Sequence, residues 1–326
     1  MARGRELEPI DYEAPELDAN EIRVSVTHCG LCYTDVHAID DYYDITEYPF
    51  VPGHEVVGHV SETGPGVTGL RVGDRVGVGW QGRSCGRCEW CEMGEEHMCE
   101  DVVNNGSWTP HGGFSTSIKA DSGFAYPLPD TLPSEAAAVL LCAGITVYSP
   151  LREYSRPSHR VGVIGVGGLG HLAIQFAHAL GCDVTVISSS PGKEEEARAL
   201  GADHFIVSGD RETLERSGPF DMFLYTAHAD LDWTSLLFNL KNEGKLVMVG
   251  FPEVPVRIEL MELVVHQQSI VGSFLGSPAT MREMLAFAEE RGIRPMVEVM
   301  PMGQVNEAIR RLKDGKAHYR IVLVNY

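Results

Sequence analysis

Four cysteines within one short segment form the strongest chemical pattern in the sequence. They are spaced Cys85-x2-Cys88-x2-Cys91-x7-Cys99 in the stretch SCGRCEWCEMGEEHMC. Four thiolates suit a closed tetrahedral Zn²⁺ site with no position left for a substrate. Disulfides explain the pattern less well, because the N-terminus MARGRELEPIDYEAPELD lacks the apolar stretch of a secretory signal. The spacing therefore predicts a structural zinc, held by a lobe over about residues 82–102.

A second set of possible ligands is dispersed along the chain. It comprises Cys29, Cys32, Thr34, Asp35 and His37 in CGLCYTDVH, His54, Glu55 and His59 in PGHEVVGH, and Cys142 in LLCAGIT. Spacing alone does not identify which of these residues converge. Cys29 and Cys32 also fit a CxxC redox pair. A catalytic metal site and a redox pair both stay open at this point.

A glycine pattern predicts a dinucleotide site. Gly165-x-Gly167-x-x-Gly170 follows the apolar stretch VGVI and begins a segment with a helical apolar stripe over 169–180. In this context the first glycine permits a tight turn, the second lets the backbone approach a pyrophosphate, and the third lets the helix pack on the sheet. The unpaired N–H groups of the helix N-terminus then face the phosphates.

The residues after the next strand indicate the choice of cofactor. An acidic residue normally ends this strand when the ligand is NAD. Here DVTVIS leads into Ser188, Ser189 and Ser190, followed by Lys193. Hydroxyls and a lysine can bind a 2′-phosphate, whereas a carboxylate would repel it. We therefore predict NADP(H), with a polar loop that caps the next helix as the alternative.

The elements that position these residues divide the chain. The first 120 residues read as an all-β region of short strands broken by glycine turns. A helix is expected from SEAAAVLLCAGITVYSPL, with Ser134 as its N-cap. Strands and helices then alternate from residue 160, which is typical of an α/β fold with a doubly wound parallel sheet. The C-terminal strand YRIVLVN belongs to a tail too short to be a domain, so we expect the tail to return to the first domain.

Composition excludes several functions. The chain has 326 residues, of which 44 % are hydrophobic and 22 % are charged, values ordinary for a globular protein. Its 46 acidic and 26 basic residues give a formal net charge of −20. Phosphate backbones and anionic membranes would be repelled, so neither is an expected partner. A run of about 18 apolar residues is not evident in the sequence, so no membrane span is expected, and the location is expected to be cytoplasmic.

Together these motifs resemble a known family. The stretches CGLCYTDVH, PGHEVVG, VGDRVGVG, LLCAGITVYSPL, GVGGLGHLAIQFA and VTVISSSPGKEEEA are similar to zinc-dependent medium-chain alcohol dehydrogenases, and in particular to the cinnamyl-alcohol-dehydrogenase-like branch of NADP-dependent aldehyde reductases. The resemblance runs from about residue 22 to the C-terminus. It implies a GroES-like, β-rich catalytic domain over 1–145 and 276–326, a Rossmann domain over 146–275, and a homodimer or homotetramer.

The resemblance also implies roles for individual residues. Cys32, His54 and Cys142 hold a catalytic zinc, with Glu55 as a possible exchanging ligand and Asp35 orienting His54. Thr34 takes the proton of the alcohol and passes it, through the cofactor ribose, toward His37. The implied cofactor contacts are Gly165, Gly167, Gly168, Leu169, Gly170, Ser188, Ser189, Ser190, Lys193, Val249, Gly250 and, at the pyrophosphate, Arg320. The implied pocket residues are Tyr43, Trp80, Phe251 and Leu275.

The expected function is reversible hydride transfer between NADP(H) and a primary alcohol or aldehyde, aromatic or of medium length, with two zinc ions per chain. Two features depart from the family pattern: Tyr33 stands where many relatives carry a basic pyrophosphate contact, and the segment 100–110 is short. The alternatives are a zinc-free quinone or enone reductase of the same fold, and a non-catalytic zinc or redox sensor.

Overall fold

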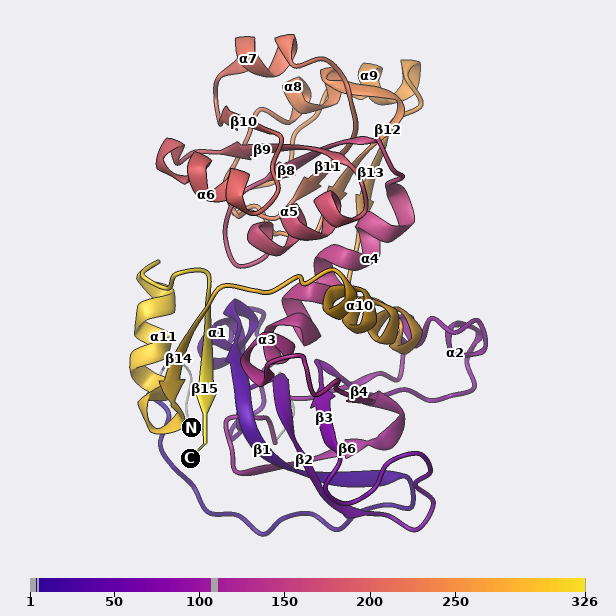
Figure 1. Ribbon diagram of the computed structural model, residues 1–326, viewed down its shortest axis with the longest axis vertical. Helices are drawn as coiled ribbons and strands as arrows, with labels where there is room; N and C mark the ends of the chain where they lie inside the picture. The colour runs from indigo at the N-terminus through magenta and orange to yellow at the C-terminus, as the bar shows by residue number, and fades with distance from the viewer. Residues whose placement is uncertain (1–3, 5, 107–110, 326) are drawn as a thin grey trace. The chain divides into compact units, whose positions relative to one another are not determined.

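The computed structural model describes residues 4, 6–106 and 111–325, and the chain divides into two compact units. The first unit contains Met1–Cys142, Gly276–Glu289 and Arg294–Tyr326, and the second contains Ala143–Leu275 and Glu290–Ile293. The tail of the chain therefore belongs to the first unit, as the yellow β14 and β15 beside the indigo β1 show in Figure 1.

The first unit is built on a seven-stranded sheet. The order is β14-β15-β1-β2-β3-β7, with β6 also pairing β1, and all of these pairs are antiparallel except β14 with β15. Its strands are β1 (Glu21–Leu31), β2 (Glu55–Thr63), β3 (Arg75–Val78), β6 (Ser117–Asp121), β7 (Ala125–Pro127), β14 (Val297–Pro301) and β15 (Arg320–Val324). A separate two-stranded sheet pairs β4 (Gln81–Arg83) with β5 (Val103–Asn104).

The largest part of this unit's core in β1 comes from every second residue, because alternate residues of a strand share one face of the sheet. Ile22, Val24 and Val26 of β1 pack with Val56 and Val60 of β2. The helices of the unit are α1 (Tyr33–Asp40), α2 (Glu89–Glu92), α3 (Ser134–Val139), α10 (Pro278–Glu290) and α11 (Val305–Lys313), with short 3-10 turns η1 (Glu96–Met98), η2 (Ser122–Phe124) and η5 (Met302–Gln304). The expectation of an all-β region over the first 120 residues was wrong at α1 and α2.

The helix expected from residue 134 is present but begins differently. Ser134 is its first helical residue and Pro133 is the N-cap, so the prediction of Ser134 as N-cap was wrong. The Ser134 hydroxyl instead accepts a hydrogen bond from Nη1 of Arg75 at 2.8 Å. Proline suits this place because its fixed φ and missing N–H cost nothing at a helix start. After α3 the chain passes through a π-helical turn, η3 (Leu140–Gly144), which carries Cys142.

Within the part of the chain that the structure describes, one helical stretch, Ser134–Tyr154, is long and apolar enough to cross a membrane by length and composition. The prediction from the sequence, that the chain has no apolar run of this length, therefore does not hold for this stretch. Of its most apolar window, 78 % is buried inside the fold. A buried core helix meets the same two criteria, because it too has apolar residues on all sides.

The second unit is a parallel six-stranded sheet in the order β10-β9-β8-β11-β12-β13. Its strands are β8 (Arg160–Ile164), β9 (Asp183–Ser188), β10 (His204–Val207), β11 (Phe220–Tyr225), β12 (Leu240–Met248) and β13 (Ser269–Gly272). Its helices are α4 (Ile145–Tyr154), α5 (Gly170–Ala179), α6 (Glu194–Ala199), α7 (Arg211–Arg216), α8 (Trp233–Phe238), α9 (Leu260–Val265) and the 3-10 turn η4 (Pro191–Lys193). The strand order reverses direction beside β8, which is the switch point where doubly wound sheets bind ligands.

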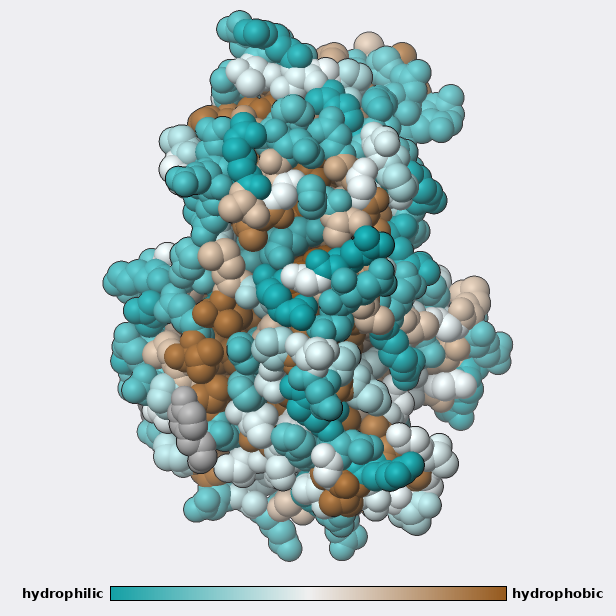
Figure 2. Space-filling model, in the orientation of Figure 1, coloured by the Kyte–Doolittle hydropathy of each residue, from teal (hydrophilic) through white to brown (hydrophobic). Residues whose placement is uncertain are grey.

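Hydrophilic residues cover most of the face of each unit that Figure 2 shows. This is the surface expected of a chain with 46 acidic and 26 basic residues.

Candidate metal sites and dinucleotide-binding turn

Asp35 links the two segments that carry Cys32 and His54. It is fully buried in the first turn of α1, which begins one residue after Cys32. Its Oδ2 accepts a hydrogen bond from the backbone N–H of Cys32 at 2.9 Å. Its Oδ1 accepts from Nδ1 of His54 and from the backbone N–H of Gly53, both at 3.0 Å. A carboxylate on Nδ1 fixes the ring orientation and leaves Nε2 for a ligand, as at many metal-binding histidines.

Four of the dispersed residues form one cluster. Cys32, His54, Glu55 and Cys142 each offer a ligand atom, and these atoms all lie within 4.8 Å of one another. The sulfurs of Cys32 and Cys142 are 3.9 Å apart. Two thiolates on a tetrahedral zinc are separated by about 3.8 Å, since each Zn–S bond is about 2.3 Å. Two thiols, an imidazole and a nearby carboxylate therefore fit a zinc ion in both donor type and spacing.

Cys29 and His59 lie outside this cluster. Cys29 is buried in the core between β1 and β2, and burial raises the pKa of its thiol well above the usual value. His59 is exposed on β2, where it faces Ser25 of β1 in the register. The sulfur that lies beside Cys32 is that of Cys142, which argues against a redox pair of Cys29 and Cys32.

Hydrogen bonds and charge set the protonation of the cluster. The bond from Cys142 lowers the pKa of Cys32 well below the usual value, against the effect of burial, and the same bond raises the pKa of Cys142. Burial alone would lower the pKa of His54, but Asp35 and Cys32 together outweigh burial, and the pKa is raised well above its usual value. The site thus favours a thiolate at Cys32, the form of cysteine that binds metal.

Glu55 is paired with Arg320, the first residue of β15, in a buried ion pair. Burial raises the pKa of Glu55 to about 7, although the charge of Arg320 opposes this shift. Arg320, which we expected at the cofactor pyrophosphate, thus has its guanidinium on Glu55. The two residues are 265 positions apart, and no local sequence signal could have predicted the pair.

Thr34 and His37 lie on α1, next to the cluster. The Thr34 hydroxyl is 3.5 Å from the sulfur of Cys32. The His37 ring stacks on Tyr42 at a centroid distance of 4.7 Å and meets the edges of Tyr33 at 5.1 Å and Tyr43 at 5.6 Å. His37 therefore sits among three tyrosine rings, an arrangement that we did not foresee from the sequence although all four residues lie close together in it.

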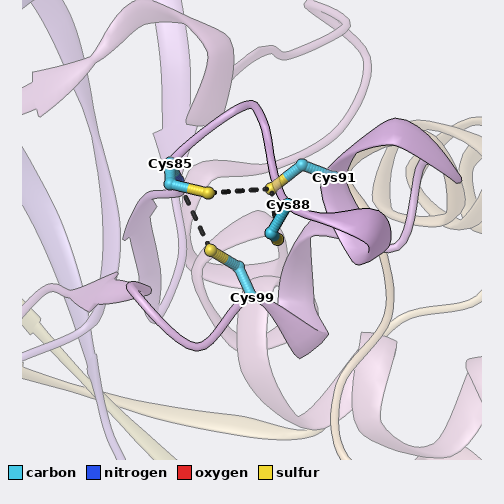
Figure 3. Close-up of side chains that lie close together, drawn as sticks. All are labelled: Cys85, Cys88, Cys91 and Cys99. Carbon is cyan, nitrogen blue, oxygen red and sulfur yellow. Dashed lines mark hydrogen bonds between the residues drawn. The ribbon is translucent and has the colours of Figure 1, made fainter.

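The four-cysteine lobe has the geometry of a closed metal site (Figure 3). The sulfur of Cys91 is 4.0 Å from that of Cys85 and 3.5 Å from that of Cys88. The backbone N–H of Cys85 points at the sulfur of Cys99 at 3.4 Å. These sulfur separations again match a tetrahedral zinc with four thiolates. A metal here has no open position, so the site is suited to holding the lobe together and not to chemistry.

The glycine-rich turn follows β8 in the second unit. Gly165 has φ +96°, a conformation that other residues rarely adopt. A Cβ on Gly170 would lie 2.0 Å from the carbonyl oxygen of Gly165, so only glycine fits at the start of α5. A Cβ on Gly167 would meet nothing within 4 Å, which leaves its backbone open to a ligand. Gly168 and Leu169 complete the turn before α5.

The polar residues after β9 lie beside this turn. Ser188 is buried and its hydroxyl accepts the backbone N–H of Ser190 at 3.2 Å, whereas Ser189 and Ser190 are exposed. Lys193 donates to the carbonyl oxygen of Val166 at 2.6 Å, within the glycine-rich turn. The lysine ammonium and the glycine-rich turn are therefore neighbours in one unit.

The remaining predicted residues are divided between the units. Tyr43 and Trp80 belong to the first, and Val249, Gly250, Phe251 and Leu275 to the second. The backbone N–H groups of Val249 and Gly250 both donate to Tyr225 at the end of β11, so this pair follows the switch region of the sheet. Residues 107–110, part of the short segment expected to alter the cleft, lie outside the described residues.

Comparison with known proteins identifies the class. Residues 18–130 match the model of the alcohol dehydrogenase GroES-like domain, and residues 168–290 match that of the zinc-binding dehydrogenase domain. The aldehyde reductase AdhA of Synechocystis is 41 % identical over 99 % of this chain and 96 % of its own. A cinnamyl alcohol dehydrogenase of Sorghum bicolor has a TM-score of 0.92 and 41 % identity, covering 98 % of this chain and 94 % of that one.

A third relative, a cinnamyl alcohol dehydrogenase of Helicobacter pylori solved with NADP(H), has a TM-score of 0.88 and 30 % identity over 99 % of this chain and 95 % of its own. The two domains and their sites define an alcohol dehydrogenase or aldehyde reductase with a GroES-like and a Rossmann domain. Within that class, the chain belongs to the zinc-dependent medium-chain alcohol dehydrogenases, in the cinnamyl-alcohol-dehydrogenase-like branch.

Proposed function

We propose that this protein is an NADPH- and zinc-dependent reductase of aromatic or medium-length aldehydes, with two zinc ions per chain. The observation that carries the proposal is the buried cluster of Cys32, His54 and Cys142, with Asp35 fixing two of its members. A Cys₂His set leaves one position of a tetrahedral zinc for a substrate. The four-cysteine lobe holds the second, structural ion.

Different residues of the chain bind the metal, bind the cofactor and transfer the proton in this proposal. When bound, Zn²⁺ supplies Lewis acidity toward a carbonyl oxygen and NADPH supplies the hydride. Cys32, His54 and Cys142 hold the metal, and Asp35 keeps the imidazole in the orientation that ligation needs. The glycine-rich turn from Gly165 to Gly170 binds the cofactor pyrophosphate. The carbonyl carbon accepts the hydride, and its oxygen then needs one proton to become an alcohol.

Thr34 supplies that proton. Thr34 is two residues after Cys32, and its hydroxyl lies 3.5 Å from the Cys32 sulfur. The hydroxyl is therefore next to the proposed metal position. A hydroxyl both donates and accepts, so Thr34 passes a proton on without holding charge. His37, on the same helix α1, would return a proton from solvent to Thr34, and a bound cofactor would supply ribose hydroxyls for this transfer. In alcohol oxidation the same groups carry the proton outward.

Thr34→Val keeps the shape of the side chain and removes its hydroxyl. We expect kcat to fall by about 100-fold or more, the range of a lost acid–base group. His37→Gln should lower kcat less, because water can replace a group at the outer end of the relay. Single-turnover measurements of NADPH oxidation test this. Near-normal turnover in Thr34→Val, with hydride transfer rate-limiting, would show that the relay assignment is wrong.

The substrate proposal follows from the family branch and from the size of the side chains expected at the pocket, Phe251, Leu275, Trp80 and Tyr43. An apolar pocket gains about 0.8 kcal/mol for each buried CH₂ group. Aromatic and medium-length aldehydes should therefore exceed acetaldehyde in kcat/KM. A kinetic screen of aliphatic and aromatic aldehydes with both cofactors tests this, and the highest kcat/KM with acetaldehyde would overturn it.

We further propose a homodimer formed through the Rossmann sheets, with a tetramer as a larger assembly. Strand β13 is an edge of the six-stranded sheet. Beside it in sequence, α9 exposes large hydrophobic residues, with Met261 at 71 % and Val264 at 75 % exposed. An apolar edge of this kind favours pairing with a second copy. Light scattering should give at least twice the 35.7 kDa chain mass, and a monomer at micromolar concentration would contradict this.

Two other functions are less well supported. A zinc-free quinone or enone reductase does not require the two sets of metal ligands that this chain has. A non-catalytic sensor does not require the glycine-rich turn with its neighbouring lysine. The cytoplasmic location proposed from the sequence suits an enzyme whose free cysteines bind metal in their reduced form.

A further inference from the structure

Trp80 lies in a short turn that packs against Leu141, the residue before the proposed metal ligand Cys142. The turn consists of Gly79 and Trp80, between β3 and β4, and all of it belongs to the first unit. A Cβ on Gly79 would lie 3.0 Å from the carbonyl oxygen of Leu141, the residue before Cys142. The backbone beside Trp80 therefore packs against the segment that carries a proposed metal ligand, and a shift of this turn would move Trp80 relative to that ligand.

Asn105 holds this turn through two hydrogen bonds. Its backbone N–H donates to the carbonyl oxygen of Trp80 at 2.7 Å, and its side-chain Nδ2 donates to the carbonyl oxygen of Gly79 at 3.0 Å. Asn105 is itself buried, so these bonds are protected from water. One residue thus fixes two consecutive peptide groups, those that precede and follow Trp80.

The four-cysteine lobe supports the same turn from its other side. Strands β4 and β5 flank the lobe in sequence, and Gln81 pairs with Asn104 in their register. The buried side chain of Gln81 also donates to the carbonyl oxygen of Glu96, within the lobe, at 2.6 Å. The residues on either side of the lobe, Gln81 and Asn105, therefore meet at Trp80.

We propose that Asn105 is a positioning residue for substrate selection: it fixes Trp80, and through Trp80 it sets the width of the substrate pocket. The inference rests on the proposed aldehyde reductase function and deepens it. Asn105 acts through the backbone of Gly79 and Trp80, and the proposed function assigns Trp80 to the substrate pocket. Loss of the side-chain bond lets the turn relax, so discrimination between bulky and small aldehydes weakens.

The test compares Asn105→Ala, Trp80→Ala and the double variant in zinc-loaded enzyme with benzaldehyde and acetaldehyde. Asn105→Ala should change the ratio of the two kcat/KM values by about fivefold, the effect of one lost hydrogen bond. The change should arise in KM for benzaldehyde, with kcat for acetaldehyde retained. Because Asn105 acts through Trp80, the double variant should show the same ratio as Trp80→Ala alone.

Gly82→Ala provides a second variant, in which residue 105 is still asparagine. Its new Cβ would lie 2.6 Å from Oδ1 of Asn105 and so displaces that side chain. Amide hydrogen exchange over residues 79–83 gives a readout independent of turnover, and both variants should accelerate it. Unchanged exchange and an unchanged ratio in a folded Asn105→Ala enzyme would overturn the inference, as would multiplicative effects in the double variant. If wild-type protein reduces no aldehyde, the proposed function fails, and the exchange experiment still decides whether Asn105 holds the turn.

Discussion

Cys32→Ser is expected to abolish NADPH-dependent aldehyde reduction while the protein stays folded. Cys32 is the one thiol of the buried cluster that favours the thiolate form, because Cys142 donates a hydrogen bond to it. Serine has nearly the same size, and its hydroxyl is a poor zinc ligand at neutral pH. The backbone bond from residue 32 to Asp35 does not involve the sulfur, so the start of α1 should persist.

Cys91→Ser is the matched control, because it makes the same change in the other cysteine cluster. The sulfur of Cys91 lies 3.5 Å from that of Cys88 in the closed lobe, a site that we propose does not bind substrate. Its loss should lower Tm by several degrees or impair assembly, since structural zinc contributes directly to folding. Metal analysis should give two zinc ions in wild type and one in each variant. One zinc or none in freshly prepared wild-type protein would contradict the assignment, and so would a Cys32→Ser enzyme with normal turnover.

The second large effect is the choice of cofactor. We expect NADPH to exceed NADH in kcat/KM by roughly 100-fold, which corresponds to about 2.7 kcal/mol. The cofactors differ only in the 2′-phosphate, and one or two charge-assisted hydrogen bonds of roughly 1.5–3 kcal/mol each suffice for this margin. The exposed hydroxyls of Ser189 and Ser190 can supply them. Lys193 adds a positive charge beside the glycine-rich turn.

Negative charges near this loop oppose the preference but should not reverse it. Glu194 is already paired with Arg198 at 2.9 Å, which reduces its field at the loop. The overall charge of −20 acts at longer range and is screened beyond about 8–10 Å at ordinary salt.

Two variants separate the contributions to cofactor choice. Ser189→Asp should weaken NADPH binding and improve NADH binding, because a carboxylate repels the phosphate and accepts from the free ribose hydroxyls. Lys193→Ala should weaken NADPH binding alone. Isothermal titration with each cofactor and steady-state kinetics measure both effects. Equal kcat/KM for the two cofactors in wild-type enzyme, or a preference for NADH, would refute the role given to the serine loop.

The features that were predicted from sequence are those whose determinants are local. The four cysteines of the lobe lie within one short segment, and so do the glycines from Gly165 to Gly170. Their spacing in the sequence is therefore enough to predict how they are arranged in space. The second cluster is different: Cys32 and Cys142 are 110 positions apart, and only the family resemblance brought them together. No pattern in the sequence predicts the ion pair of Glu55 with Arg320, because the two residues lie on β2 and β15, which are far apart in the chain.

Two local errors have physical causes. Helix α1 was missed because its N-cap is Cys32, which is not among the usual capping residues, and because the preceding strand extends to Leu31. The signal that could have revealed it is Asp35, three residues after Cys32, where its carboxylate accepts the Cys32 N–H. Ser134 was assigned as a cap because serine is favoured there, but the helix begins one residue earlier than that assignment requires, and Pro133 fits the N-cap because the helix needs no N–H from it.

The central proposal is that NADPH reduces an aldehyde at the zinc held by Cys32, His54 and Cys142. The most direct test follows NADPH oxidation with benzaldehyde at 340 nm in enzyme with both metal sites filled, in enzyme from which a chelator has removed the zinc of the Cys32, His54 and Cys142 site, as metal analysis of wild type and of Cys32→Ser verifies, and in the same enzyme after zinc is restored. We predict rapid oxidation, then loss of activity with the cofactor still bound, and then recovery. Oxidation that continues unchanged in the chelated enzyme, or no oxidation at any stage with any aldehyde of the panel, would contradict the account.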